Sequence, residues 1–208
     1  MKKEVQEFNN IKEIIYNSAK KYKDHIAFTI KHQNGKEVEY ENKTYPDVLN
    51  DINTLGKALY DLGAKGKRVA IIGKNRYEWV IAHLANLLGG IVSVPLDKDL
   101  QIEELESSLI RSKADYIVFD SKLTEKMQEI RNNNKTNLKE FICMDKKEGF
   151  LSIAELLEKG KKIENDEYVK NEIDNDAMGI LLFTSGTTSK SKAVMLSQKN
   201  IVSNIYAM

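Results

Sequence analysis

The chain has 208 residues, of which 41% are hydrophobic and 30% are charged, so its composition is that of a globular protein. A chain of this length buries roughly 70% of its unfolded surface, and we expect a folded core in one or two domains. The 32 basic and 31 acidic side chains leave a net charge of +1, which excludes a general attraction to nucleic acid or to anionic lipid.

Membrane and secretory signals are missing from the sequence. No run approaches the roughly 18 apolar residues needed to span a bilayer. The two N-terminal lysines are not followed by the apolar segment of a signal peptide. Cys143 is the single cysteine and lies in an apolar stretch, which favours a buried thiol over a nucleophile. We therefore expect a cytoplasmic protein without disulfides, and nothing in the sequence indicates its oligomeric state.

The first predicted elements are a helix, a hairpin and a second helix. Apolar residues at helical spacing predict an amphipathic helix over 10–23. Strands at 26–30 and 38–45, with a glycine-containing turn between them, indicate a hairpin. Thr44 stands where a helix N-cap is expected, and the helix that follows is predicted to end at Gly63.

Beyond residue 66, continuous apolar strands alternate with amphipathic helices. The predicted strands lie at 68–73, 91–96, 115–120, 140–144 and 178–183. The predicted helices lie at 75–88, 100–112, 121–131 and 152–162. Asn75 is expected to cap the first of these helices. The alternation predicts an α/β fold with a mostly parallel sheet flanked by helices on both faces. The acidic stretch at 164–177 is expected to be a surface linker that leads to the last of these strands.

A loop rich in hydroxyl groups follows that strand. It offers four hydroxyl donors, backbone N–H groups that a glycine leaves accessible, and two positive charges, which together can bind phosphate groups. The residues concerned are Thr184, Ser185, Gly186, Thr187, Thr188, Lys190 and Lys192. Without context, the same run is also typical of a solvated turn. The apolar strand patterns on both sides of it favour the phosphate site.

The Walker phosphate loop is the most familiar motif of this kind, and the chain does not match it. When the motif GxxxxGK[ST] is aligned on Gly186, Ser191 takes the place of the second glycine and Ala193 takes the place of the hydroxyl residue. The context differs as well, because AVMLS after Lys192 is predicted to be a strand. The next helix is expected to begin only after Ser197 as its N-cap.

The string FTSGTTSKSKAVMLSQKN resembles the Ser/Thr-rich loop of the acyl-adenylate-forming enzymes, which include acyl-CoA synthetases, luciferases and adenylation domains of nonribosomal peptide synthetases. The usual family pattern is Tyr or Phe followed by TSGTTGxPKGVMLSH. The upstream segment from TYPDVL to VPLDKDL is also similar to the N-terminal region of that family. The resemblance covers the chain from about residue 11 to residue 208.

The resemblance implies an ATP-dependent ligase that joins a carboxylic acid, here a fatty acid, to coenzyme A through an acyl-adenylate, with Mg²⁺ as cofactor. It implies that residues 184–188 and Lys192 bind the ATP phosphates, with Lys190 at the tip of the loop as a further contact. Residues 1–208 then form the N-terminal portion of an AMP-binding domain. The C-terminal remainder, with the catalytic groups, is expected to lie outside this chain, which by itself is predicted to be inactive. The alternative is a stand-alone noncatalytic α/β domain that binds a nucleotide or a protein.

Several positions depart from the family pattern. Ser189, Ser191 and Ala193 stand where the family has glycine, proline and glycine, and Gln198 stands where it commonly has histidine. The loss of glycine disfavours positive φ, and the loss of proline restores an N–H group and loosens the loop. No role of the family histidine is carried over to this chain.

Other polar groups are expected to be structural. His83 lies within an apolar helix, which favours a satisfied structural histidine over a ligand or base. Three acidic residues could suggest a metal site, namely Asp97, Asp99 and Glu103. The favoured interpretation is that these carboxylates complement the dipole at the start of a helix.

Overall fold

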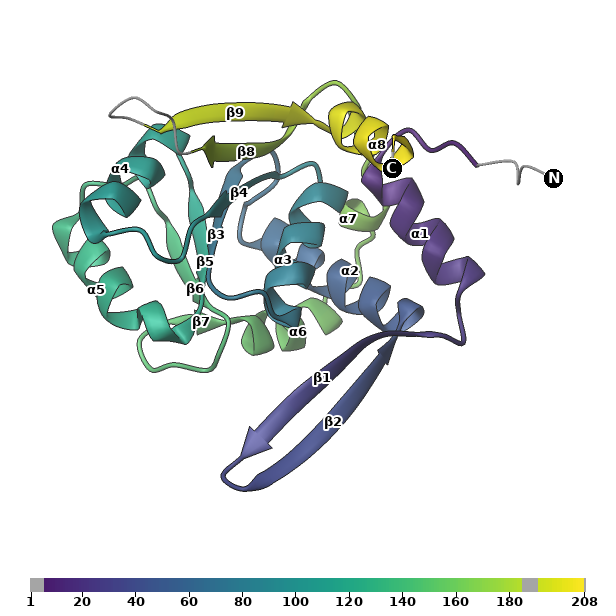
Figure 1. Cartoon of the computed structure of the whole chain (residues 1–208), viewed down its shortest axis with the longest axis horizontal. Helices are drawn as coiled ribbons and strands as arrows, with labels where there is room; N and C mark the ends of the chain where they lie inside the picture. The colour runs from purple at the N-terminus through teal and green to yellow at the C-terminus, as the bar shows by residue number, and fades with distance from the viewer. Residues whose placement is uncertain (1–5, 185–190, 208) are drawn as a thin grey trace.

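A twisted, mostly parallel sheet forms the centre of the molecule (Figure 1). The computed structural model describes residues 6–184 and 191–207. Among these residues, seven strands pair in the order β7-β6-β5-β3-β4-β8-β9, and β9 alone runs antiparallel to its neighbour. The strands are β3 (Arg68–Ile72), β4 (Val92–Leu96), β5 (Tyr116–Phe119), β6 (Glu140–Cys143), β7 (Leu151–Ser152), β8 (Met178–Thr184) and β9 (Lys192–Ser197). The predicted mostly parallel sheet is confirmed, and the short β7 is an addition to the prediction.

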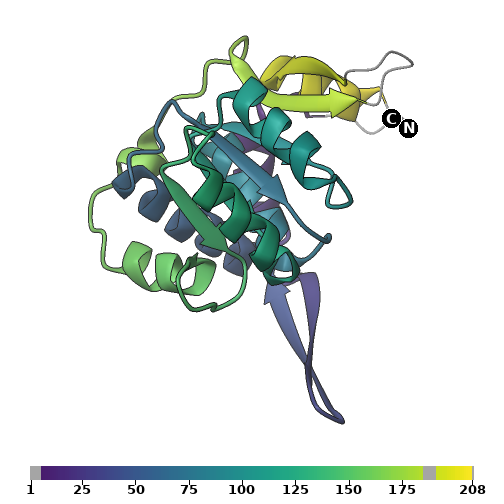
Figure 2. The same ribbon diagram turned by 90° about the vertical axis from the view of Figure 1, so that its left-hand side faces the viewer.

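Helices cover both faces of this sheet, as predicted. One face carries α1 (Ile11–Lys21), α2 (Tyr45–Asp61), α3 (Tyr77–Leu88), α6 (Ile153–Lys161), α7 (Glu167–Lys170) and α8 (Gln198–Tyr206). The other face carries α4 (Ile102–Ser112) and α5 (Thr124–Asn133), which follows a 3-10 turn at Ser121–Leu123. In Figure 2 these two helices lie in front of the strands. Each face has its own buried apolar cluster, so the continuous apolar strands are explained by burial on two sides.

A long hairpin projects from this body. Its strands β1 (Ile26–Asn34) and β2 (Glu37–Thr44) pair from Asn34↔Glu37 back to Ile26↔Thr44. β1 extends four residues beyond its predicted end, whereas β2 has the predicted length and begins one residue earlier. Most of β2 is exposed. Phe28 near the base packs edge-on against Tyr77 of α3, with ring centroids 5.5 Å apart. The hairpin therefore joins the body at its base.

Two of the predicted helix N-caps are confirmed, and a third is wrong. Thr44 caps α2 and Ser197 caps α8, each in a reciprocal pair of hydrogen bonds with the residue three positions later. Asn75 does not cap α3, which is a correction. Arg76 takes the N-cap position without a side-chain cap bond, because the helix begins one residue later, at Tyr77.

The stretch 164–177 is exposed at many positions, but the expected surface linker contains one buried anchor, Tyr168. Tyr168, in the short helix α7, is 1% exposed and donates a hydrogen bond from its hydroxyl to the carbonyl oxygen of Ala85 at 2.8 Å. Its ring occupies a slot beside Gly56 and Gly89, two positions where a Cβ atom would meet the ring. The sequence did not predict this buried contact, because a single aromatic residue in an acidic run produces no helical periodicity.

Candidate functional site

The candidate site lies where β8 ends and β9 begins. The two strands pair antiparallel from Met178↔Ser197 to Thr184↔Lys192, with one register shift between Met178 and Ile180, so the residues on either side of the loop are held next to each other. The hydroxyl of Thr184 is 3.5 Å from the carbonyl oxygen of Lys192, and both residues are exposed. Of the predicted phosphate-binding residues, the structure thus places Thr184 and Lys192 together. Ser185, Gly186, Thr187, Thr188 and Lys190 lie outside the described residues.

This junction stands at the carboxyl edge of the sheet. β8 runs parallel to β4 through the pair Ser93↔Ile180, so Thr184 leaves the sheet on the same edge as the ends of β4 and β3. Open α/β sheets bind ligands at this edge, because the loops that follow parallel strands converge there. The buried residues Ile180 and Leu181 fix β8 in the core, while Thr184 reaches solvent. The setting suits a binding loop on a rigid support.

Gln198 holds the far end of this strand pair. It is 2% exposed, and its Oε1 accepts a hydrogen bond from the backbone N–H of Ile11 at 3.2 Å. Its Nε2 donates to the carbonyl oxygen of Leu87 at 3.0 Å. The amide thereby ties the start of α8 to α1 and α3. The residue that replaces the common family histidine is therefore a buried structural clamp in this chain, a role that the sequence did not indicate.

Arg111 also contacts the junction, and sequence analysis missed it. It lies in the last turn of α4 and donates a hydrogen bond to the carbonyl oxygen of Ser191 at 2.7 Å across 80 residues of sequence. No local pattern carries such a contact, since it depends on how α4 packs beside β8. Only an alignment showing covariation of these two positions could have revealed it.

His83 and Cys143 are structural, as expected. The imidazole Nδ1 of His83 lies 2.8 Å from the hydroxyl of Ser93, and its ring stacks on Trp79. Burial lowers the pKa of His83 to about 4, so the ring is neutral near pH 7. Cys143 is buried, and burial raises the pKa of its thiol, which disfavours the nucleophilic thiolate.

The described residues contain neither a cluster of metal ligands nor a membrane-spanning helix. Glu103 lies in the first turn of α4, where a carboxylate complements the helix dipole. Over residues 6–184 and 191–207, no three His, Cys, Asp or Glu side chains cluster closely enough to hold a metal ion. Within the same ranges, no helix combines the length and the apolar character that a bilayer crossing requires.

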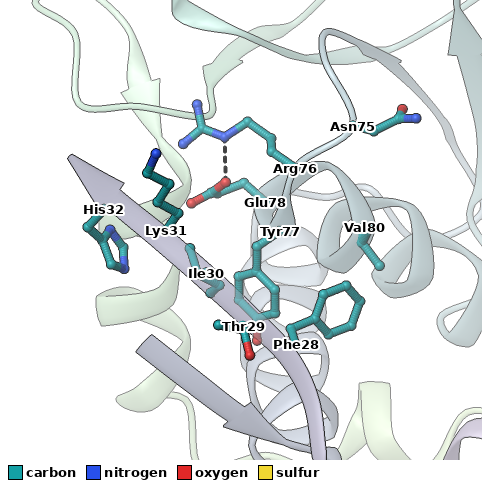
Figure 3. A pocket seen from close by; sticks show the side chains of 10 residues that line it. All are labelled: Phe28, Thr29, Ile30, Lys31, His32, Asn75, Arg76, Tyr77, Glu78 and Val80. Carbon is teal, nitrogen blue, oxygen red and sulfur yellow. Dashed lines mark hydrogen bonds and ion pairs between the residues drawn. The ribbon is translucent and has the colours of Figure 1, made fainter. Parts of the chain in front are cut away.

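A separate hollow of about 480 Å³ lies between β1 and the start of α3 (Figure 3). Phe28 and Tyr77 form part of its apolar wall. Arg76 at its rim is compensated by two carboxylates, Glu78 at 2.6 Å and Asp145 at 2.9 Å. The hollow shares no residue with the β8–β9 junction.

Comparison with known proteins identifies the family of the chain. The family model described as AMP-binding enzyme matches residues 15–208, which is nearly the whole chain. The chain belongs to the AMP-binding enzyme family. The family loop pattern falls on residues 183–198, a range that includes the end of β8, all of β9 and Gln198.

Individual members of the AMP-binding family show the same relationship. Fatty acyl-CoA synthetase B of Dictyostelium discoideum is 27% identical over 99% of this chain and 32% of its own length. Long-chain-fatty-acid–CoA ligase 5 of Mus musculus is 27% identical over 81% of this chain and 27% of its own length. The solved structure of a long-chain-fatty-acid-CoA ligase (FadD1) from Archaeoglobus fulgidus superposes with a TM-score of 0.81 at 21% identity, covering 97% of this chain and 39% of that one. The last similarity establishes the fold, and the chain spans about a third of the length of its curated relatives.

Proposed function

We propose that this chain is the N-terminal portion of an ATP-dependent carboxylate–CoA ligase that activates a fatty acid. Membership of the AMP-binding family supports the nucleotide chemistry, and the similarity to proteins named as fatty acyl-CoA synthetases supports the substrate class. The observation that carries the proposal is the pairing of Thr184 with Lys192 at the carboxyl edge of the sheet. It holds a hydroxyl and a cation side by side at the ends of the family loop.

In the proposed reaction, a carboxylate oxygen of the acid attacks the α-phosphorus of ATP. The bond from that phosphorus to the bridging oxygen breaks, and pyrophosphate leaves. The thiolate of coenzyme A then attacks the acyl carbonyl carbon, and AMP leaves with the electron pair of the acyl–oxygen bond. In both steps negative charge on the phosphate oxygens must be held in place, which is the task of fixed donors and cations.

The loop residues supply these groups in our proposal. The hydroxyl and backbone N–H groups of residues 184–188 hold the β- and γ-phosphates in line with the attack. Lys192 neutralises the leaving pyrophosphate, and Lys190 is the second cation. Mg²⁺, which the family resemblance implies, would supply further positive charge at the phosphates beside Lys192. The attacking acid and coenzyme A are bound by parts of the protein beyond these residues.

Isotope exchange between pyrophosphate and ATP tests this function in the full-length protein. We expect exchange that depends on an added carboxylic acid, that is faster with straight-chain fatty acids than with aromatic acids, and that is followed by formation of an acyl-CoA when coenzyme A is added. Hydrolysis of ATP to ADP, or exchange without an acid, would contradict the proposal. ATP binding without any exchange would favour the alternative of a noncatalytic nucleotide-binding domain.

A further inference from the structure

Arg111 contacts both strands where they leave the sheet at the candidate site. Its Nη1 donates a hydrogen bond to the hydroxyl of Ser191 at 3.1 Å, and its Nη2 donates to the carbonyl oxygen of the same residue at 2.7 Å. The guanidinium carbon also lies 5.2 Å from the ring centroid of Phe183, at cation–π distance. Phe183 precedes Thr184, and Ser191 precedes Lys192. One side chain therefore bridges the two described flanks of the loop.

The support beneath Arg111 is rigid. Leu105 and Leu109 of the same helix are 0% and 1% exposed in the core between α4 and the sheet. The helix ends at Ser112, and Lys113 follows in the left-handed conformation with φ 53°. The guanidinium therefore extends from an element that is packed along its length, and the planar fork loses little further freedom when it forms two hydrogen bonds.

The partners of Arg111 leave its charge uncompensated. The hydroxyl, the carbonyl and the aromatic ring that it contacts are all neutral. Within residues 6–184 and 191–207, no carboxylate forms an ion pair with it. A carboxylate at this place would weaken the binding of phosphate, whereas neutral partners hold the side chain and preserve its positive potential.

The position that Arg111 holds is one at which this chain departs from its family. Ser191 stands where the family pattern has proline, whose ring fixes φ near −65° and stiffens the chain. Serine lacks that restraint, but its hydroxyl is one of the two groups that Arg111 binds. We infer that Arg111 is a positioning residue which, through Ser191, replaces the proline restraint and fixes the backbone that leads into Lys192. The inference rests on the proposed function for its effect on ATP.

The first test measures ATP dependence of pyrophosphate exchange in the full-length protein. Arg111→Met is expected to raise the KM for ATP on the order of tenfold, the effect of losing hydrogen bonds to a charged group, with the KM for the acid unchanged. Arg111→Lys keeps the charge but not the fork, so it is expected to show most of this loss. Adding Ser191→Pro to Arg111→Met is expected to restore the KM for ATP to within about threefold of the wild type, because proline needs no clamp.

Arg131 offers a matched control on the same face of the sheet. It lies in α5, donates to the carbonyl oxygen of Gly149 at 2.9 Å and stacks on Phe150 at 4.2 Å, so it makes the same kinds of contact away from the junction. Arg131→Met is expected to leave the KM for ATP unchanged. The inference is overturned if Arg111→Met behaves like this control, if Arg111→Lys behaves like the wild type, or if Ser191→Pro does not rescue.

Hydrogen exchange of the backbone amides at 192–194, measured without nucleotide, separates this inference from the proposed function. Arg111→Met is expected to accelerate exchange there about tenfold, and the added Ser191→Pro is expected to reverse the change. If the wild type shows no pyrophosphate exchange but these amides respond as expected, the function fails and the positioning role stands. Unchanged amide exchange in Arg111→Met would refute the positioning role itself.

Discussion

Replacement of Gly56 by alanine tests how the chain is anchored between α6 and β8. A Cβ atom at Gly56 would lie 2.0 Å from Cζ of Tyr168 and 2.2 Å from its Cε2. The ring has no room to move, because its hydroxyl is bonded to Ala85 O and a Cβ atom at Gly89 would also lie 2.6 Å from it. The side chain of Tyr60 closes a further side, with the two ring centroids 5.2 Å apart.

Two opposing effects set the expected change in the free energy of unfolding. Alanine in a helix interior is better than glycine by about 1 kcal/mol. Expelling a large aromatic side chain from a core costs about 3–5 kcal/mol. We therefore expect Gly56→Ala to lower the free energy of unfolding by about 2–4 kcal/mol, as measured by urea denaturation followed by circular dichroism.

A second variant identifies the ring as the cause. Tyr168→Leu keeps an apolar side chain but removes Cζ and both Cε atoms, which are the atoms that the new methyl group would meet. In that background, Gly56→Ala is expected to stabilise the protein by about 0.5–1 kcal/mol, so the sign of the effect reverses. Equal losses in both backgrounds, or a loss below about 1 kcal/mol in the wild type, would refute the reasoning, because the slot would then tolerate a methyl group.

Two further predictions concern stability. Burial lowers the pKa of His83 to about 4 from 6.5. The stability that the buried neutral imidazole contributes is therefore fully present above pH 6.5. It is lost as the pH falls towards 4, by roughly 3 kcal/mol of the free energy of unfolding in total. His83→Gln is expected to flatten this part of the stability profile, while the same change at the exposed His25 leaves it as in the wild type; identical profiles for both variants would argue against burial as the cause. Gly160→Ala places a Cβ atom 2.0 Å from the backbone oxygen of Thr54, so it is expected to cost about 1–3 kcal/mol by forcing α6 away from α2. The exposed Glu158→Ala in α6 serves as its control, with an expected change within about 0.5 kcal/mol, and a similarly small loss for Gly160→Ala would contradict the close crossing.

Local rules predicted much of the fold. Continuous apolar strands and amphipathic helices indicated the parallel sheet, and hydroxyl residues at helix starts indicated the caps at Thr44 and Ser197. The errors arose where long-range packing decides. Asn75 has the side chain of a cap, but the helix starts after Arg76, whose guanidinium is paired with Glu78 and Asp145. Tyr168 belongs to a polar stretch and is buried only because two distant glycines leave it a slot.

In the candidate site too, the sequence predicted some features, while long-range packing determined the others. The family motif located the loop, and the register of β8 with β9 brings Thr184 and Lys192 together. The contacts of Arg111 and Gln198 could not be predicted from the sequence, because both depend on partners that are distant along the chain. A pattern of residues along the chain specifies which groups are available. Only the packed structure specifies which of them meet.

We propose above all that Lys192 neutralises the pyrophosphate that leaves ATP. Carboxylate-dependent exchange of pyrophosphate into ATP, measured in the full-length protein for the wild type and for Lys192→Ala, tests it most directly. Loss of the cation is expected to slow exchange at least 100-fold, the usual effect of removing one fixed group that stabilises transition-state charge. Lys199→Ala, an exposed lysine beyond the strand pair, is expected to leave the rate unchanged. Exchange at the wild-type rate in Lys192→Ala would contradict the claim.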